Sequence, residues 1–184
     1  MASAFKPAFN VKMTTIEDFD FLNSDIVAFP GGIGDADEFY KIFNGGHIRK
    51  LKRFLDNGGK YLGICMGAYW AGAQYFNILG DADAVQYITQ PNTDIETEWQ
   101  TIANVKWYDK NYKMYFYDGC AIVGELDETE IIATYANGDA MAVIKNGVGV
   151  IGCHPESEKW WHDEIGYWHH GICNKLLQEF AIDL

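Results

Sequence analysis

The chain of 184 residues is 48% hydrophobic, which excludes a disordered polypeptide and is enough for one domain with a substantial core. Its formal net charge of −12 argues against nucleic acid as a partner, because that requires a basic face, and against an anionic membrane surface. No apolar stretch has the length of a membrane span, and the N-terminus lacks a signal-peptide pattern.

The four cysteines show no CxxC spacing and lie at positions 65, 120, 153 and 173. In a chain of this size without a secretion signal, such cysteines are typical of reduced thiols. We therefore expect a cytoplasmic protein that needs no metal and no cofactor. The absence of an internal repeat or linker predicts a single domain over residues 1–184.

The first half of the chain predicts strands that alternate with helices. Strands are expected over residues 9–16, 25–29 and 61–64, and helices over residues 37–43, 48–55 and from residue 68 to about 79. The second helix has one apolar face and is stopped by Asn57-Gly58-Gly59. This β–α order indicates a parallel sheet.

The second half predicts a series of short strands. Candidates are residues 97–107, 113–117, 121–123, 131–135, 140–144 and 148–153. Hairpin turns are expected at Asp118-Gly119, Asn137-Gly138 and Asn146-Gly147. A final helix carries apolar residues at helical spacing, namely Ile165, Trp168, Ile172, Leu176 and Phe180.

Cys65 lies between an apolar strand and a helix of small residues, with Gly63 and Gly67 close on either side. A nucleophile elbow needs this layout, because backbone crowds the nucleophile on a sharp turn. The N–H groups at the start of the helix would favour thiolate over thiol. The alternative interpretation is a small buried core residue.

Pro30-Gly31-Gly32 ends the strand that precedes the elbow unit. Ligands bind beyond the carboxyl ends of strands in open parallel sheets, so this loop and Cys65 would share one edge. The N–H groups of Gly31 and Gly32 could join that of Met66 in an oxyanion hole. The alternative interpretation is an ordinary turn.

His154 and Glu156 follow another apolar strand. The imidazole could take the proton from Cys65, and Glu156 could hold the imidazole in the required tautomer. Glu158 is a weaker candidate for the same role. The alternative interpretation is a surface-loop histidine near solvated acids.

Residues 160–170 are rich in tryptophan and histidine, but their spacing does not match a familiar zinc pattern. We interpret most of the segment as packing, with Trp160 and Trp161 as candidate pocket walls and Trp168 on the final helix. Asp35 and Asp37 are either a polar pocket edge or a helix cap.

These residues together resemble class I glutamine amidotransferase-like proteins. The resemblance rests on residues 29–32 (FPGG), 57–69 (NGGKYLGICMGAY) and 154–156 (HPE), and it spans about residues 25–156. The sequence of residues 57–69 is most similar to the amino-terminal domain of biotin–protein ligases and its stand-alone microbial relatives.

The resemblance implies an α/β fold, a flavodoxin-like three-layer sandwich with a mostly parallel sheet and a hairpin-rich second half. By motif, Cys65 would be the nucleophile, His154 the base and Glu156 the orienting acid. A glutamine-hydrolysing member passes ammonia to a synthetase. The expected partners are therefore a small-molecule amide or peptide-like substrate and a synthetase, since the chain carries no synthetase or ligase domain.

The N-terminus departs from the family pattern, because only 24 residues precede Asp25. Family members usually open with a further strand and helix. We expect this first strand–helix unit to be missing. Residues 9–16 would then pair directly with residues 25–29, or leave backbone groups unpaired.

Three hypotheses on function follow from these residues. The first is a cysteine-dependent amide hydrolase or amidotransferase that works through a thioester. The second is a non-catalytic binding or regulatory module on the same fold. The third is an intracellular cysteine peptidase.

Overall fold

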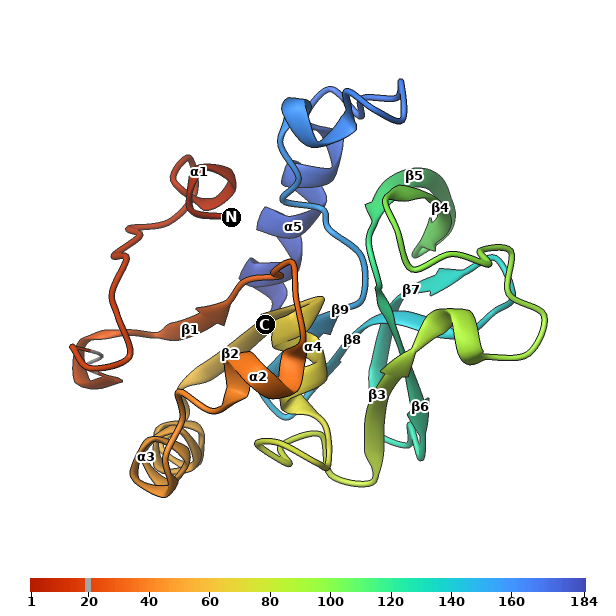
Figure 1. The fold of residues 1–184 in the computed structure, drawn as a ribbon. Coiled ribbons are helices and arrows are strands. Elements are labelled where there is room, and N and C mark those ends of the chain that lie inside the picture. The colour runs from red at the N-terminus through yellow and green to blue at the C-terminus, as the bar shows by residue number, and fades with distance from the viewer. Residues whose placement is uncertain (19–20) are drawn as a thin grey trace.

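A mixed sheet of nine strands forms the centre of the protein in the computed structural model, which describes residues 1–18 and 21–184 (Figure 1). The strands are β1 (Ile26–Phe29), β2 (Lys60–Ile64), β3 (Ala82–Gln86), β4 (Thr101–Trp107), β5 (Lys110–Phe116), β6 (Cys120–Gly124), β7 (Glu130–Tyr135), β8 (Ala140–Lys145) and β9 (Val148–Ile151). The helices are α1 (Ala2–Phe5), α2 (Ala36–Tyr40), α3 (Gly45–Asp56), α4 (Met66–Ala71) and α5 (Ile172–Asp183), with short 3-10 turns at Phe21–Asn23, Tyr87–Thr89 and Lys159–His162.

The sheet runs in the order β1-β2-β9-β8-β7-β4-β5, and the β3–β6 pair joins it at β8. Strand β2 is parallel to both β1 and β9, whereas the other strand pairs of the described residues are antiparallel. The sheet is therefore mixed and not mostly parallel as predicted, because the strands of the hairpin-rich second half pair mainly in the antiparallel direction. The short hairpin connections there force antiparallel pairing.

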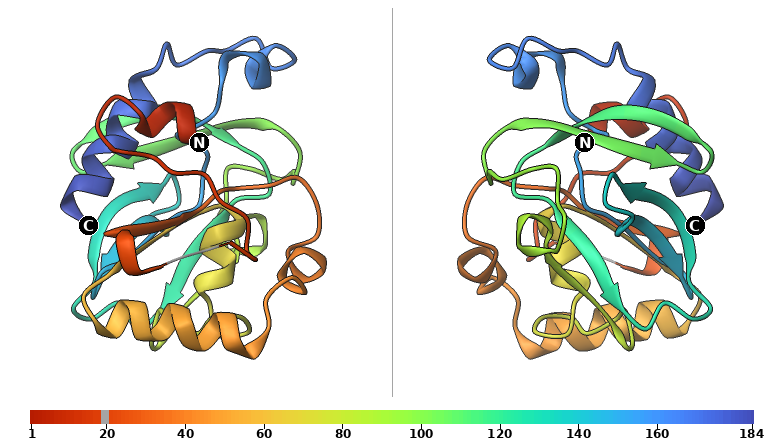
Figure 2. Two further views of the ribbon diagram at one scale, coloured as in Figure 1. Left: turned by 90° about the vertical axis from the view of Figure 1, so that its left-hand side faces the viewer. Right: turned by 90° about the vertical axis from the view of Figure 1, so that its right-hand side faces the viewer.

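Helices cover both faces of the parallel strands (Figure 2). Tyr61 of β2 packs with residues of α3 and α4, and its neighbour Leu62 packs with residues of α1 and α5. Successive residues of a strand point to opposite faces, so β2 must be apolar throughout. Its last four residues are indeed buried.

The expected helices 37–43 and 48–55 are confirmed as α2 and α3. Asn44 begins α3, where its side-chain oxygen accepts hydrogen bonds from the N–H groups of Gly46 and His47 at 2.8 and 3.1 Å. Gly58 follows the last turn with φ +88°, a conformation that glycine adopts without strain.

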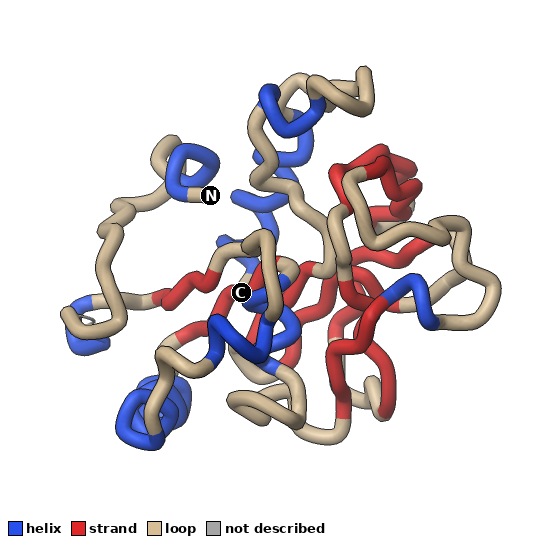
Figure 3. The backbone as a smooth tube through the Cα atoms, viewed as in Figure 1, coloured by secondary structure: helices blue, strands red, loops and turns tan. Residues whose placement is uncertain are grey.

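The N-terminal segment corrects one prediction. Residues 9–16 form no strand but run as a loop (Figure 3). Helix α1 precedes them and packs on α5, with Phe5 buried and its ring 5.7 Å from that of Phe9. The aromatic side chains of this segment are thus used in packing on α5. Strand β1 pairs with β2, and residues 9–16 do not extend the sheet beyond it.

Four further features differ from prediction. Helix α5 begins at Ile172, after Gly171 with φ +77°, so Trp168 is not part of it. Helix α4 ends at Ala71, well before residue 79, and strand β3 was not predicted. The turn at Asp118-Gly119 joins β5 to β6, which do not pair, and is no hairpin.

The hairpin turns at Asn137-Gly138 and Asn146-Gly147 are confirmed, because they join the antiparallel pairs β7–β8 and β8–β9. Asn146 and Gly147 both have positive φ, at 50° and 76°. A two-residue turn that matches the twist of its strands requires these values. This turn sets the register of β9, whose carboxyl end leads to His154.

Candidate functional site

Cys65 occupies a sharp turn between β2 and α4. Its backbone has φ 48° and ψ −102°, values that side-chain-bearing residues rarely adopt. Its N–H donates a hydrogen bond of 2.8 Å to the carbonyl of Ile151, which ties the turn to the end of β9. Strain of this kind costs about 1–3 kcal/mol and persists only where the surroundings impose it.

The two flanking glycines explain how the turn is accommodated. A Cβ on Gly63 would lie 2.3 Å from the carbonyl oxygen of Gly67, and a Cβ on Gly67 would lie 2.4 Å from that of Phe29. Both contacts are with backbone atoms, which cannot move aside as the end of a flexible side chain could. The turn that presents Cys65 therefore requires glycine at both positions.

His154 and Glu156 form a buried pair just beyond β9. The imidazole Nδ1 lies 3.1 Å from a carboxylate oxygen of Glu156, and each of the two residues is only 2% exposed. The N–H of His154 donates to the carbonyl of Tyr115 at 2.9 Å, and the rings of Tyr115 and Trp161 pack against the imidazole. These contacts fix the ring orientation.

The charge on His154 depends on its neighbours. Burial alone lowers the pKa of His154, but the sulfur of Cys65 and the carboxylate of Glu156 outweigh burial and hold that pKa well above its ordinary value. The Nε2 atom of His154 has no hydrogen-bond partner in the described part of the chain. It is therefore free to exchange a proton.

Gly31 lies against both Cys65 and His154. A Cβ placed on Gly31 would meet the His154 ring carbon Cε1 at 2.4 Å and the Cβ of Cys65 at 3.2 Å. Gly32 lies beside Met66, whose methyl carbon would be 3.3 Å from a Cβ there. The structure thus brings the glycine loop, the elbow and the His154–Glu156 pair to one place.

The sulfur of Cys65 is covered in this structure. It lies 3.5 and 3.9 Å from the carbonyl oxygens of Tyr117 and Asp118, and Cys65 is 3% exposed. The hydroxyl of Tyr69 donates to the Asp118 carbonyl at 3.1 Å, and Gln86 donates to the Asp118 carboxylate at 2.6 Å. The turn formed by residues 117–119 therefore covers the thiol of Cys65.

Glu158, the rival carboxylate, points elsewhere. It is exposed and accepts hydrogen bonds from Ser3 and Trp160 at 2.9 and 3.0 Å. Asp35 is a helix cap, since its carboxylate accepts from the N–H groups of Asp37 and Glu38 at the start of α2. Trp160 is 66% exposed and lines no wall of this site, whereas Trp161 does.

A second buried cluster, which the sequence did not predict, begins at Ser157, the residue after Glu156. The Ser157 hydroxyl oxygen lies 3.0 Å from Nε2 of His162 and 3.2 Å from Nε2 of His169, and all three side chains are buried. The N–H of Gly171 donates to Nδ1 of His169 at 3.1 Å, so a neutral His169 carries its proton on Nε2. The Nε2–H group of His169 then donates a hydrogen bond to the Ser157 oxygen, and the Ser157 hydroxyl donates to Nε2 of His162.

Burial lowers the pKa of both histidines of this cluster, and that of His169 to about 4. Both are therefore neutral near pH 7. The spacing of His162 and His169 in the sequence gives no signal of this contact, because the irregular segment 163–170 brings them together.

The remaining cysteines are buried thiols. All four cysteines of the described residues are free, and burial raises the pKa of Cys120, Cys153 and Cys173, the last to about 12. Within residues 1–18 and 21–184, no cluster of three or more histidine, cysteine or acidic side chains is placed to hold a metal ion. The helices of these residues are also too short or too polar for a membrane span.

Comparisons with known proteins concern the family match and the fold. Residues 11–86 match the family model described as biotin-protein ligase, N terminal. No curated protein matches the sequence.

Several solved structures share the fold. A glutamine amidotransferase is 14% identical with a TM-score of 0.62, over 85% of this chain and 79% of its own. A glutamine amidotransferase from Thermotoga maritima is 17% identical with a TM-score of 0.56, over 89% and 73%. PurLQS from Thermotoga maritima is 13% identical with a TM-score of 0.61, over 90% and 82%. The resemblance expected from the sequence is therefore confirmed: the chain has a glutamine amidotransferase-like fold, and its residues 11–86 match the N-terminal region of biotin–protein ligases.

Proposed function

We propose that the chain is a cysteine-dependent amide hydrolase of the amidotransferase type, with Cys65, His154 and Glu156 as its triad. The observation that carries the proposal is the strained turn at Cys65 beside a buried histidine that is oriented by a carboxylate. A nucleophile, a base and an orienting group in this order are what acyl transfer requires.

In the proposed reaction the proton of the Cys65 thiol lies on Nε2 of His154, since the thiolate and Glu156 together favour the imidazolium, and the thiolate attacks the amide carbonyl carbon. The tetrahedral oxyanion is held by N–H groups of the Gly31-Gly32 loop and of Met66. His154 returns the proton to the leaving nitrogen, so that ammonia and a thioester form. Water, deprotonated by His154, then hydrolyses the thioester and releases the acid and the thiol.

Two wider expectations belong to this proposal. A partner synthetase would take up the ammonia, and the shared fold with PurLQS suggests such a partner. We further propose one flavodoxin-like domain over residues 1–184 and a cytoplasmic location, which would keep the four free cysteines reduced.

One observation favours a second candidate, a non-catalytic binding module on the same fold. The carbonyl oxygens of Tyr117 and Asp118 lie against the Cys65 sulfur, where they accept from a thiol and repel a thiolate. Catalysis therefore requires the turn of residues 117–119 to move when substrate enters.

A glutamine-like diazoketone separates the two candidates. We expect it to alkylate Cys65 in the wild-type protein, as located by peptide mapping, and to leave Cys65→Ala unmodified. Labelling of Cys65 by iodoacetamide but not by the glutamine analogue would favour the binding module. Cleavage of a peptide library that is lost in Cys65→Ala would instead indicate a peptidase.

A further inference from the structure

The turn of residues 117–119 lies over the Cys65 sulfur and joins β5 to β6. The carbonyl oxygens of Tyr117 and Asp118 are the atoms of this turn that lie 3.5 and 3.9 Å from the sulfur. Because Cys65 is only 3% exposed, a molecule reaches its sulfur only after part of this cover has moved.

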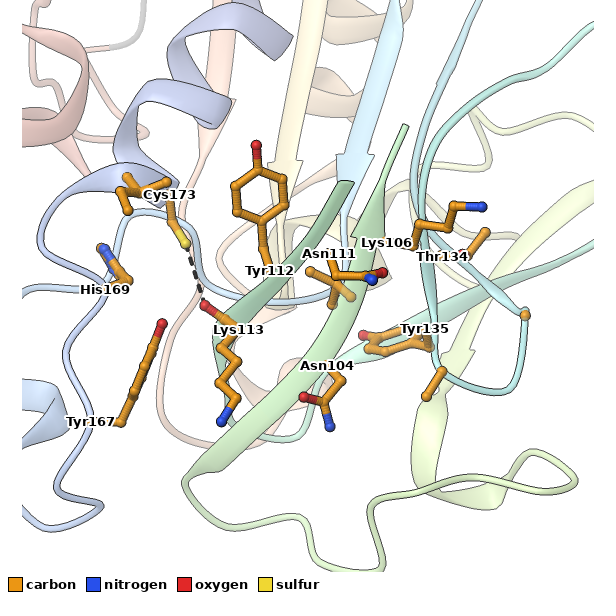
Figure 4. Close-up of a pocket in the computed structure, with 14 residues that line it drawn as sticks. Asn104, Lys106, Asn111, Tyr112, Lys113, Thr134, Tyr135, Tyr167, His169 and Cys173 are labelled. Carbon is orange, nitrogen blue, oxygen red and sulfur yellow. Dashed lines mark hydrogen bonds between the residues drawn. The ribbon is translucent and has the colours of Figure 1, made fainter. Parts of the chain in front are cut away.

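The strand before the turn is fixed. Strand β5 pairs with β4 along its whole length, and the Cys173 thiol donates to the Lys113 carbonyl at 3.6 Å, which ties β5 to α5 (Figure 4). The cavity of about 930 Å³ in this view is lined by β4, β5, β7 and the segment that leads into α5, and no residue of the turn lines it. Movement of the turn therefore does not require movement of β5.

The strand after the turn is fixed as well. Strand β6 pairs with β3 along its length. Gly119 is buried against the chain, because a Cβ there would lie 2.6 Å from the carbonyl oxygen of Gly152, and its own carbonyl accepts from the N–H of Tyr87 at 3.0 Å. The part of the turn that can move is thus limited to Tyr117 and Asp118.

Tyr117 and Asp118 are half-buried and belong to neither core cluster. The ring of Tyr117 lies 6.1 Å from that of Trp99, which is 60% exposed. Asp118 has φ +43°, a left-handed conformation that aspartate tolerates better than most residues. Displacement of these two residues would therefore leave the core packing intact.

Three hydrogen bonds hold Asp118 in place. Its N–H donates to the carbonyl of Glu98 at 2.7 Å, in an exposed loop. Its carbonyl accepts from the Tyr69 hydroxyl at 3.1 Å, and its carboxylate accepts from the Gln86 amide at 2.6 Å. Tyr69 belongs to α4 and Gln86 to β3, so these two bonds attach the turn to the rigid part of the fold.

The turn and His154 act on the Cys65 thiol in opposite directions. The two carbonyl oxygens accept from a thiol and repel a thiolate, whereas the His154–Glu156 pair favours the thiolate. In the closed arrangement the sulfur is therefore shielded and biased towards the less reactive thiol. Opening of the turn would remove both restraints at once.

We propose that Tyr117 and Asp118 form an autoinhibitory gate over Cys65, and that Tyr69 and Gln86 are the latch that holds it closed. Substrate enters when the two latch hydrogen bonds break, so the latch sets the fraction of the protein in the open state. The gate rests on the proposed function only in taking Cys65 as the reactive thiol.

Iodoacetamide labelling of the full chain near neutral pH measures the gate, because the labelling rate of Cys65 scales with the open fraction. Reactions that are quenched at set times and mapped by mass spectrometry give the rate for each cysteine. We expect Tyr69→Phe and Gln86→Met each to raise the rate at Cys65 about fivefold, and the double variant to raise it at least about tenfold.

Tyr75→Phe and Gln90→Met are the matched controls. Tyr75 donates to Asp37 at 2.6 Å and Gln90 donates to Thr89 at 3.3 Å, so neither hydrogen bond involves the turn. Both controls should label Cys65 within about twofold of the wild-type rate. The other three cysteines are buried and should keep their wild-type rates in the latch variants.

Wild-type rates at Cys65 in both latch variants would overturn the gate. An equal rise at all four cysteines would also overturn it, because it would indicate a general loss of stability. Failure of the proposed function gives a different result. Iodoacetamide would then label Cys65 faster in the latch variants, which supports the gate, but the glutamine-like diazoketone would label neither these variants nor the wild type.

Discussion

Two histidine clusters follow strand β9, and their neighbours set opposite protonation states. His154 lies beside a sulfur and a carboxylate, and its pKa is raised. His162 and His169 lie beside a hydroxyl and each other, and burial lowers the pKa of both. All three imidazoles are almost fully buried. The identity of the neighbouring groups, and not depth alone, therefore decides which histidine carries charge.

The two clusters also differ in which imidazole nitrogen lacks a partner among the described residues: Nε2 of His154 in the first and Nδ1 of His162 in the second. The Nε2 atom of His154 has no partner among the described residues, whereas the Nε2 atoms of His162 and His169 both contact Ser157. The first arrangement suits a group that exchanges protons. The second suits a rigid support, and Ser157 joins it directly to Glu156 in the sequence.

The difference predicts opposite pH windows for stability. A histidine whose pKa is raised on folding stabilises the protein at low pH, and this contribution is lost as pH rises through the raised value. A histidine whose pKa is lowered binds fewer protons when folded than when unfolded. It therefore destabilises the protein as pH falls below its ordinary value.

The largest expected effect is an acid-dependent one at His169. Between about pH 7 and pH 4 the lowered pKa of His169 should cost about 3 kcal/mol of unfolding free energy. His169→Gln replaces the imidazole by an amide, which can still hydrogen-bond but cannot become charged. The stability of this variant should therefore fall less over this pH range, by about that amount. Urea unfolding of both proteins at the two pH values measures the difference. Equal losses in both would show that His169 is not held neutral.

The next largest effect is expected at His154. His154→Ala removes the group placed to take the Cys65 proton, so alkylation of Cys65 near neutral pH should slow about 100-fold. Alkylation reactions that are quenched at set times and analysed by mass spectrometry give the rate at each pH. His162→Ala is the control, because His162 contacts Ser157 but not Cys65, and should change the rate far less. An unchanged rate profile in His154→Ala would refute the triad.

Ser157→Ala tests the support itself. The substitution removes the hydroxyl between two buried imidazoles, and leaving buried polar groups unpaired should cost about 2 kcal/mol of unfolding free energy. Chemical denaturation near neutral pH measures it. Ser3→Ala, which removes an exposed hydroxyl, should cost little. If Ser157→Ala lost as little unfolding free energy as Ser3→Ala, His162 and His169 would have other hydrogen-bond partners.

The smallest expected effect comes from Glu156→Gln. The amide can still accept from Nδ1 of His154 but carries no charge, so imidazolium is stabilised less. Alkylation of Cys65 should slow about tenfold, which is less than in His154→Ala because Glu156 acts through the histidine. Glu158→Gln, which touches no triad residue, should match wild type. A greater effect for Glu156→Gln than for His154→Ala would contradict this order of roles.

The sharp turn at Cys65 could be predicted from the sequence because its constraints are local. The spacing of Gly63, Cys65 and Gly67 within five residues determines backbone crowding, and the structure shows the contacts that demand both glycines. The approach of His154 to Cys65 is not local. It was expected because both follow apolar strands whose carboxyl ends share one edge, and because the family resemblance implied it.

The parts that escaped prediction depend on long-range packing. Residues 9–16 alternate loosely enough to indicate a strand, but only Phe9 and Val11 pack against the core cluster that includes α5, residues 12–15 are exposed, and the segment stays a loop. Strand β3 contains an aspartate, Asp83, and gave no apolar pattern, yet it pairs with β6 along its length. The Ser157 cluster arises from an irregular segment, where no periodicity exists to be recognised.

The central claim is that Cys65 is the activated thiol of this protein. Limited alkylation of the native chain near neutral pH, followed by peptide mapping of all four cysteines, tests it most directly. The account predicts that Cys65 is modified first, because His154 lies beside it while burial raises the pKa of Cys120, Cys153 and Cys173. Modification of Cys120 or Cys173 ahead of an untouched Cys65 would contradict it.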